Sequence, residues 1–569
     1  MSGFVVAQFA LDRAGAAFGD RLARNRWNVE VVGTTRIAVD ALPLRRVDTS
    51  GGPLILIGEA HGDLTLTVDE DGAARARALL DALWGGFIAV IFDRADRFLG
   101  VLRDPTGAVD CVVRRRPDRF VAANQAEALI LASEQACAPA WNGVAGVLRD
   151  WNTLSSASLL EDSRTLPPGG WIDPAGRERQ LWSPAHYVWT GRAVDAPRLR
   201  GVIDETVRSM TQGRGPLLAE VSGGLDSAMM ASSYRATGWS EGSLWLNIFG
   251  PFAEADERAY AQAVADRLGV ALTSVGRKPD SLRSGLDLDH PRTLRPWPNR
   301  MDADYDRLQA ALCEMHGLSG ILTGKGGDVA FFQTPTSAIV ADEIRSRGAA
   351  AVWSPTAWVL ANRLRRSVWR VARAGVAQAL RSPSLRPCVN PLLHPDVRGL
   401  RPSPHPWVCD LDGVPPAKRQ QVAGFVSNLA LHSPSRRSRQ ARLLHPALAQ
   451  PVMEAVLATP TPELTGGGHD RLLAREAFAD RLPPELVARR SKGELGAYYG
   501  RVVGANLDRL RPHLLEGCLA REGLIDREQV EAALQIERLI WQGGYVDLMM
   551  LALMESWAQA WRHEPAEGR

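Results

Sequence analysis

The chain has 569 residues, 45% of them hydrophobic and 23% charged, and its formal net charge is +3. This length predicts two to four domains, and the composition excludes a disordered or fibrous chain. A protein that coats DNA carries a strong basic field, so the near-neutral charge argues against a nucleic-acid partner.

Cysteine spacing and hydropathy favour a cytoplasmic location. The six cysteines are spread along the chain without a CxxC pair, which argues against a zinc ribbon, an iron–sulfur cluster or a disulfide scaffold. The opening residues, MSGFVVAQFALDRAG, lack the basic start and long apolar core of a signal peptide. No run reaches the ~18 apolar residues of a membrane span. We therefore expect a cytoplasmic protein without integral membrane association.

The pattern of predicted elements changes near residue 195. Up to that point short β-type runs alternate with turn signals, as in LILIG, FIAVIFD, RFLGVLRD and DCVVRRR. The proline-containing segment SPAHYVWTGRAVDAP is typical of a linker. After it, helical runs such as RLRGVIDETVRSMTQG alternate with short apolar strands such as PLLAEV and LWLNIFG. The sequence thus predicts an α/β protein, with stacked antiparallel sheets and helices in residues 1–195 and a doubly wound parallel sheet in residues 196–569.

The strongest chemical signal is the motif VSGGLDS, residues 221–227, between a predicted strand and a helix. Its two glycines let the backbone approach an anion, and the helix start supplies N–H groups and a positive dipole end. Asp226 would repel a bare phosphate, but it fits if Mg²⁺ lies between the two. The motif lacks the GxxxxGK[ST] pattern of P-loop nucleotidases. The alternative is a Gly-Gly turn whose Ser and Asp only cap the helix.

Two later features extend this site. ILTGKGGD, residues 321–328, is another strand followed by a glycine-rich turn and an acid, and Asp328 would join Asp226 at one sheet edge to hold Mg²⁺. Lys492, in ARRSKGELG, would stabilise the charge that builds up on an acyl-adenylate and its tetrahedral intermediate. The alternatives are an ordinary glycine turn and a solvated lysine.

A basic segment lies between the two features. Residues 344–395 contain no acid and several arginines, and AWVLANRLRRSVWRVARAGVAQALRS within them is predicted to be one helical run. It would form a docking face for an acidic peptide or a partner protein, touch a membrane surface, or simply be a solvated helix face.

With SGGLDS, TGKGGD and RRSKGE in this order, the chain resembles the asparagine synthetase family. LILIGEAHGD, LWGGFIAVIFDR, LRDPTG and LPPGGWI resemble landmarks of that family's glutaminase domain. The resemblance implies an N-terminal Ntn-type sandwich of antiparallel sheets, followed by an ATP-pyrophosphatase domain with a helical C-terminal part. It also implies the cofactors ATP and Mg²⁺ and an AMP-forming carbon–nitrogen ligase.

The family resemblance also assigns roles to individual residues. It implies catalytic roles for Asp226, Asp328 and Lys492, with Asp226 and Asp328 as metal ligands. The residues implied in ATP binding are Val221, Ser222, Gly223, Gly224, Asp226, Ser227, Phe249, Thr323, Gly324 and Asp328.

Departures from the family pattern decide among its members. Ser2 stands where the glutaminase nucleophile is a cysteine, and Ile57 replaces an oxyanion-donating asparagine. The first domain is therefore expected to be a degenerate, structural relic.

Lys325 stands where β-lactam synthetases carry a tyrosine and asparagine synthetases a glutamate. SPSRRSRQARLL, residues 433–444, corresponds to the family's amino-substrate wall but carries four arginines and no acid, which suits a peptide with acidic or carbonyl-rich surface.

The resulting hypothesis is a lasso-peptide macrolactam synthetase. It would adenylate an Asp or Glu side chain of a precursor peptide and join it to the peptide's own α-amine, in a roomy cavity that excludes water. A leader-binding protein and a cysteine protease are the expected partners. The alternatives are an ammonia-dependent asparagine synthetase, a small-molecule amide synthetase such as a β-lactam synthetase, and a non-catalytic relic.

Overall fold

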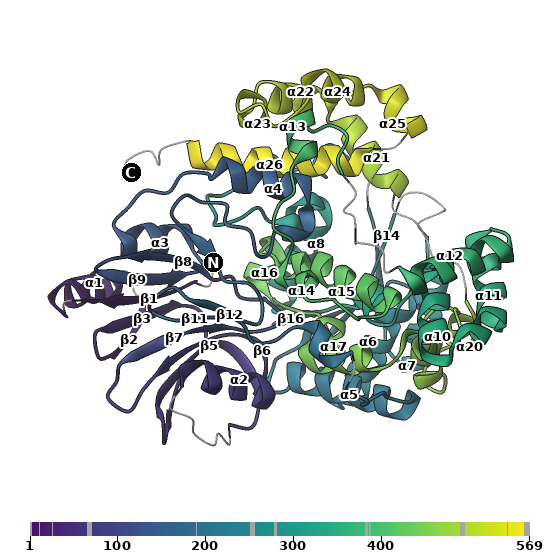
Figure 1. Ribbon diagram of the computed structural model, residues 1–569, viewed down its shortest axis with the longest axis horizontal. Helices are drawn as coiled ribbons and strands as arrows, with labels where there is room; N and C mark the ends of the chain where they lie inside the picture. The colour runs from purple at the N-terminus through teal and green to yellow at the C-terminus, as the bar shows by residue number, and fades with distance from the viewer. Residues whose placement is uncertain are drawn as a thin grey trace.

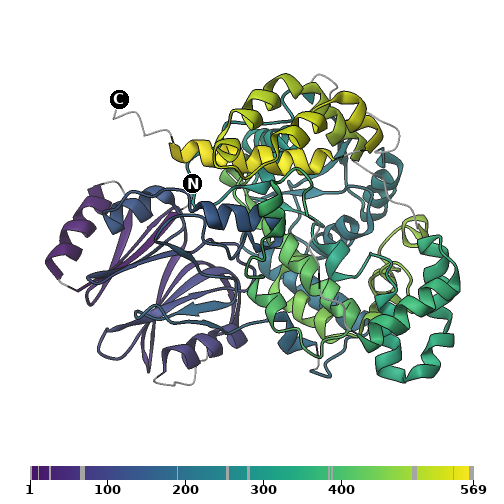
Figure 2. The same ribbon diagram turned by 45° about the horizontal axis from the view of Figure 1, so that its top comes forward.

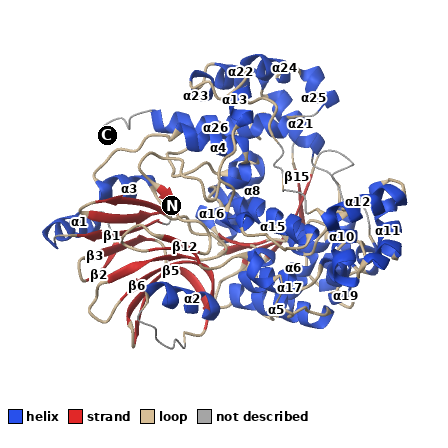
Figure 3. Cartoon of the chain, viewed as in Figure 1, coloured by secondary structure: helices blue, strands red, loops and turns tan. Residues whose placement is uncertain are grey.

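The computed structural model describes residues 3–10, 12–24, 27–64, 71–188, 190–250, 256–277, 282–381, 385, 389–489, 496–542 and 544–562. Within these residues the chain forms two six-stranded antiparallel sheets and one five-stranded parallel sheet, with helices around them (Figures 1 and 3). The predicted fold class is confirmed. No helix in the described part of the chain is both long and apolar enough to cross a bilayer.

The two antiparallel sheets stack face to face, and Figure 2 shows them as separate layers. Successive side chains of a strand point to opposite faces: Phe4 and Val6 of the first strand enter the core between the sheets, whereas Val5 and Ala7 face the covering helices. The first sheet contains β10 (Arg164–Thr165), β8 (Val112–Arg116), β9 (Arg119–Ala123), β1 (Gly3–Phe9), β3 (Thr35–Asp40) and β2 (Asn28–Val32). The second contains β12 (Glu178–Gln180), β11 (Gly170–Ile172), β7 (Phe98–Arg103), β6 (Leu83–Phe92), β5 (Gly52–Gly62) and β4 (Leu44–Thr49).

Helices cover both outer faces of this sandwich. The apolar residues of α1 (Asp12–Arg24) and α3 (Ala126–Ser133) pack on the first sheet, and those of α2 (Gly72–Ala82) pack on the second. The helix α4 (Trp141–Arg149) joins the α3 side of the sandwich to the C-terminal helices.

The parallel sheet has the strand order β15-β14-β13-β16-β17. Its strands are β13 (Leu217–Glu220), β14 (Leu244–Phe249), β15 (Leu272–Gly276), β16 (Gly320–Leu322) and β17 (Arg442–Leu444). The helices α5 (Ala196–Thr211), α6 (Leu225–Ala236) and α7 (Arg258–Leu268) share one core with this sheet, and α8 (Ala303–His316) lies against its other face. Because all neighbouring strands are parallel, their carboxyl ends meet at one edge.

The rest of the chain is mainly helical. The run predicted as one helix is two, because Arg365 has a φ of 50° and Ser367 caps a new helix start. The two are α11 (Pro355–Leu364) and α12 (Val368–Leu380). The other α-helices are α9 (Gly327–Ala330), α10 (Ala338–Arg347), α13 (Pro395–Gly399), α14 (Pro406–Cys409), α15 (Pro416–Asn428), α16 (Arg436–Gln440), α17 (Gln450–Ala458), α18 (Thr461–Thr465), α19 (Leu472–Ala477), α20 (Pro484–Ala488), α21 (Gly496–Ala505), α22 (Leu507–Leu515), α23 (Cys518–Arg521), α24 (Arg527–Ala533), α25 (Ile536–Gln542) and α26 (Tyr545–Arg562).

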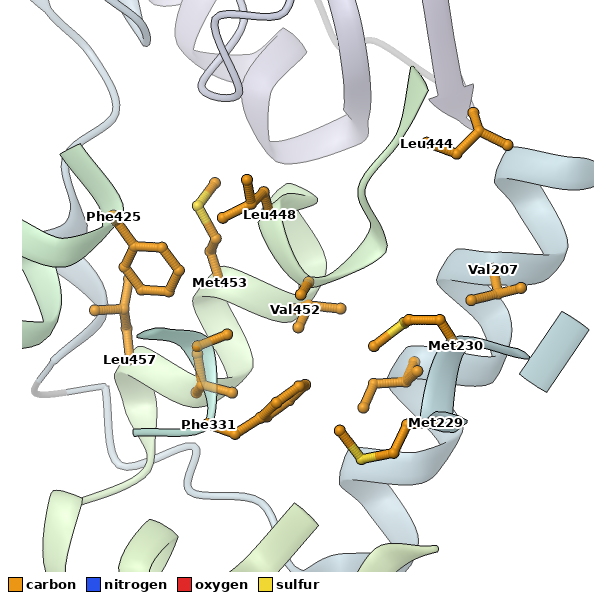
Figure 4. Packing of buried hydrophobic residues seen from close by; sticks show 14 of the residues in the cluster. Val207, Met229, Met230, Phe331, Phe425, Leu444, Leu448, Val452, Met453 and Leu457 are labelled. Atoms are coloured by element: carbon orange, nitrogen blue, oxygen red, sulfur yellow. The ribbon is translucent and has the colours of Figure 1, made fainter. Parts of the chain in front are cut away.

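One large core runs through both halves of the molecule. It combines the outer face of the second antiparallel sheet with α5, α6 and α17. Figure 4 shows Val207, Met230, Phe425 and Met453 converging there. Asp195, at the predicted boundary, caps the start of α5. The boundary itself stays a prediction.

Candidate active site

The first glycine loop joins β13 to α6 at the carboxyl edge of the parallel sheet. The hydroxyls of Ser222 and Ser227 lie 2.9 Å apart, and Ser227 also accepts a hydrogen bond from the Ser222 N–H at 3.1 Å. Gly223 has a φ of 85°, and a Cβ there would lie 2.6 Å from the carbonyl oxygen of Glu257. Only glycine fits this turn, which brings the backbone to the open N-terminus of α6, as a phosphate cradle requires.

The second glycine loop lies directly against the first. Strands β13 and β16 are neighbours, so both loops leave the sheet at the same edge. A Cβ on Gly324 would lie 2.3 Å from the backbone nitrogen of Ser227, and one on Gly327 would lie 2.5 Å from Cγ of Asp226. The loops are packed as closely as their backbones allow. The structure therefore brings together the two motifs that the sequence predicts to form one site.

Asp226 and Asp328 are joined by a residue that sequence reasoning missed. Nη1 of Arg471 lies 2.7 Å from Oδ2 of Asp226 and 3.4 Å from Oδ1 of Asp328. Although burial opposes its charge, attraction to Asp226 and Asp470 raises the pKa of Arg471. Asp226 is buried, whereas the Asp328 side chain is 48% exposed and thus open to a ligand.

The donor set at this point fits Mg²⁺. Two carboxylates and no sulfur or imidazole match an ion that prefers oxygen and takes the rest of its shell from phosphates and water. Among the described residues no cluster of three or more His, Cys, Asp or Glu side chains forms a complete metal cage. Asp226 and Asp328 would therefore hold a cation that arrives with a nucleotide, where the guanidinium of Arg471 now offsets part of their charge.

Residues distant in sequence hold both loops in place. The side-chain amide of Asn247 on β14 donates to the Val221 carbonyl at 2.9 Å. The Arg489 guanidinium donates to the Gly223 carbonyl at 3.0 Å and pairs with Glu257 at 2.5 Å. These contacts fix the two ends of the phosphate loop, and no local sequence pattern marks the residues that make them.

Thr323, predicted to contact ATP, is held by a buried histidine. Burial keeps the pKa of His445 well below its ordinary value, so the ring is neutral. Its Nε2–H donates to the Leu431 carbonyl at 3.2 Å, which leaves Nδ1 to accept the Thr323 hydroxyl proton at 2.7 Å. The hydroxyl oxygen in turn accepts the N–H of Lys325 at 3.2 Å, so His445 stabilises the conformation of the second loop.

Beside the loops is a cavity of about 240 Å³ that Lys325 lines. The Lys325 ammonium lies 4.7 Å from the ring centre of Tyr305, whose hydroxyl donates to Glu220 at the end of β13. Among the described residues the ammonium has no hydrogen bond or ion pair. Burial, with the nearby charge of Arg437, lowers its pKa to about 8. A partly desolvated cation of this kind attracts an anionic ligand.

The arginine-rich wall of residues 433–444 is only part of this cavity. Arg437 reaches it and stacks 4.8 Å from the Tyr305 ring centre, while the backbone N–H groups of Arg436 and Arg437 donate to Asp306. Other elements supply acids that the wall lacks. Despite its burial, Asp302 has a pKa held below its usual value by Arg277, which it binds at 2.8 Å. The pocket is therefore mixed in charge.

The expectation of a roomy cavity over the crevice stays a prediction. The cavity that Lys325 lines has a volume of about 240 Å³.

Phe249, which the sequence predicts to contact ATP, lies at the same edge of the parallel sheet as the glycine loops. Phe249 ends β14 at the carboxyl edge, with the Arg258 guanidinium 4.1 Å from its ring centre and Gly276 beneath it. Lys492 lies outside the described residues, as does Ser2.

Two residues of the N-terminal sandwich, Ile57 and Glu59, have packing and charge contacts that the structure describes. Ile57 on β5 is fully buried in the core between the two sheets. Glu59 pairs with Arg214 and lies 3.6 Å from Arg442, so it links the sandwich to the second half. The structural role expected for residues 1–195 stays a prediction.

Comparison with known proteins places this site in a family. Residues 198–418 and 431–562 match the family model described as asparagine synthase. This match, over more than half of the chain, defines an ATP-dependent amide-forming ligase. The chain belongs to the asparagine synthase family. No curated protein matches it.

Two solved structures show weak similarity. The allosteric regulatory enzyme of purine biosynthesis has 10% identity and a TM-score of 0.19, over 51% of this chain and 82% of that one. Glutamine phosphoribosylpyrophosphate amidotransferase from B. subtilis, complexed with ADP and GMP, has 9% identity and a TM-score of 0.19, over 56% of this chain and 90% of that one. Such scores support no statement about function.

Proposed function

We propose that this ligase is a lasso-peptide macrolactam synthetase, which closes an isopeptide ring between an Asp or Glu side chain and the N-terminal amine of a precursor peptide. The observation that carries the proposal is the position of Lys325. It lies on the second glycine loop, whose Gly324 and Gly327 pack against the first loop, and it lines a cavity. The cation takes the place of the tyrosine or glutamate of other members, and it suits a carboxylate-bearing side chain.

Different residues of the chain would bind the phosphates, the Mg²⁺ and the substrate carboxylate in this reaction. The N–H groups at the start of α6 and the Ser222 and Ser227 hydroxyls would bind the phosphates of ATP. The carboxylates of Asp226 and Asp328 would hold Mg²⁺, which neutralises phosphate charge when bound. Lys325 would attract the substrate carboxylate toward the α-phosphorus. One oxygen of that carboxylate bonds to phosphorus as the bond to pyrophosphate breaks.

Ring closure then depends mainly on holding the peptide amine close to the activated acyl carbon. The peptide amine replaces AMP at the acyl carbon and releases one proton, and holding the amine beside that carbon supplies a large effective concentration. The Lys325 cation at this cavity supports activation of an acidic side chain such as that of Asp or Glu. Such a substrate would require a leader-binding protein and a cysteine protease as partners, and cytoplasmic assembly with them.

The test is a reaction of purified protein with Mg·ATP and a trimmed precursor encoded beside its gene. Mass spectrometry should find a peptide lighter by one water, with AMP formed in equal amount. Formation of ADP and orthophosphate in place of AMP would overturn the proposal.

The small cavity also favours a second candidate, an amide synthetase for a small acyl donor. Incubation with aspartate, ammonia and ATP separates this candidate from the first, because it would yield asparagine without any peptide.

A further inference from the structure

Helix α12 carries apolar residues on two opposite sides. On the inner side, Val371 is buried and Gly375 lies so close to α10 that a Cβ there would be 2.7 Å from Val340. On the outer side, Trp369, Val376 and Leu380 recur at helical spacing and are 67%, 37% and 79% exposed. A surface helix of one domain needs only one apolar stripe, so the outer stripe lacks a structural purpose within this chain.

A groove borders the outer stripe. The 3-10 helix η6 (Ala349–Trp353) runs beside α12, and Trp353, which is 73% exposed, packs edge-on against Trp369 at 6.0 Å. The groove has a volume of about 540 Å³, and Val352, Trp353, Trp369 and Val376 form its apolar lining. Clusters of exposed tryptophan around a recess are typical of protein-binding surfaces.

The charged residues that line the groove are both arginines. Residues 344–381 contain eight arginines and no Asp or Glu. Arg370 and Arg373 line the groove itself, and among the described residues neither has an acidic partner. The elements packed against α12 are α10, α11 and η6, and their only carboxylates, Asp342 and Glu343, are buried on α10. The Asp342 carboxylate accepts the Ala417 N–H, and Glu343 binds Arg347.

We propose that Trp353, Trp369, Val376, Leu380, Arg370 and Arg373 form a docking surface, the α12 surface, for an acidic polypeptide segment of another protein. A bulky apolar side chain of that segment would fill the groove, and its carboxylates would pair with the arginine forks. The apolar side chains line a recess between two elements, which suits a polypeptide better than a flat bilayer. Figure 1 shows α11 and α12 at the opposite end of the molecule from the antiparallel sheets. The proposal does not depend on which amide the enzyme forms.

A random peptide library displayed on phage tests the charge and shape of the partner. The bait is the full-length protein, and Arg370→Glu/Arg373→Glu is the competing bait. Peptides enriched on the wild type should contain acids around an aromatic or large aliphatic residue. Equal enrichment on the charge-reversed variant, or enriched peptides without acids, would overturn the proposal.

Affinity measurements with the strongest selected peptide then locate its site. Trp369→Ala should weaken binding about tenfold or more, as expected for a central aromatic anchor. The control Arg179→Glu/Arg198→Glu, at exposed arginines of β12 and α5, should bind like the wild type. An equal loss in the control would contradict the assignment.

Sedimentation with vesicles of equal parts phosphatidylcholine and phosphatidylglycerol tests whether the α12 surface binds a membrane instead. The wild type should not sediment with them more than Trp369→Ala does. Tryptophan-dependent sedimentation without selection of acidic peptides would overturn the proposal in favour of a membrane surface.

Discussion

Arg471 and Asp226 form an ion pair of 2.7 Å across 245 residues of sequence, and it joins the start of α19 to the first glycine loop. The pair is buried, and the same guanidinium nitrogen reaches Asp328. Part of the negative charge at the centre of the predicted ATP site is thus offset before any nucleotide binds. A cation that enters with the nucleotide must share these carboxylates with Arg471.

Removal of that guanidinium should destabilise the protein strongly. Arg471→Met removes the guanidinium that joins the two carboxylates, and breaking a buried pair costs about 3–5 kcal/mol in the free energy of unfolding. Urea unfolding with EDTA measures this loss, and Mg²⁺ should restore part of it because it can replace the missing charge. The control is Arg200→Met, which breaks an exposed pair with Asp480 and should cost about 1 kcal/mol or less. Equal losses in the two variants would argue against a central role for Arg471.

Substitution of Asp328 should separate activity from folding. Its side chain is half exposed, so Asp328→Asn should unfold at the wild-type temperature. Formation of AMP from ATP should fall by about a hundredfold or more, because a charged group that organises the phosphates is lost. Radiolabelled ATP and chromatography measure the AMP formed. Asp480→Asn, at an exposed carboxylate elsewhere, should keep full activity, and wild-type turnover in Asp328→Asn would remove this residue from the site.

Lys325→Met should lower activity while it preserves or raises stability. The substitution removes a cation that lacks an acidic partner among the described residues, and relief of such burial is worth about 1–3 kcal/mol. Turnover should fall because the attraction for a substrate carboxylate is lost. Loss of stability together with activity would indicate that Lys325 only supports the fold.

The stability gain of Lys325→Met should depend on pH. The pKa of Lys325 is about 8 in the folded protein and about 10.5 in the unfolded chain. Between these values the unfolded chain binds the proton and the folded chain does not, so wild-type stability rises with pH. The advantage of Lys325→Met should therefore be full below pH 8 and shrink above it. Unfolding curves at neutral pH and near pH 9.5 test this, and a constant difference would contradict it.

Glutamine should not serve as the nitrogen donor. Ile57 is buried in the sandwich core and can donate no hydrogen bond to an oxyanion. The purified protein should release no glutamate from glutamine, with or without ATP, in an assay by chromatography. Glutamate release that Ser2→Ala abolishes would show that the amidase is intact.

Much of the fold follows from local sequence. The short apolar runs LILIG and FIAVIFD predict strands that the structure contains as β5 and β6, and the first glycine motif joins a strand to a helix as expected. The sequence predicts residues 357–382 as one helix and misses the break at Arg365. Helix-forming residues continue through this position, but the Arg365 backbone is left-handed. Composition does not reveal a single residue's φ.

The site residues also fall into those that local sequence indicates and those that only long-range packing brings together. Glycine spacing, strand ends and acids next to them are short-range properties, so the sequence was enough to indicate Asp226 and Asp328 and the edge where they meet. Arg471, His445 and Asn247 act through side chains that reach the loops from distant segments. Their roles, and the exposure of the outer stripe of α12, depend on long-range packing, because a contact between remote residues exists only once the helices and sheets have docked.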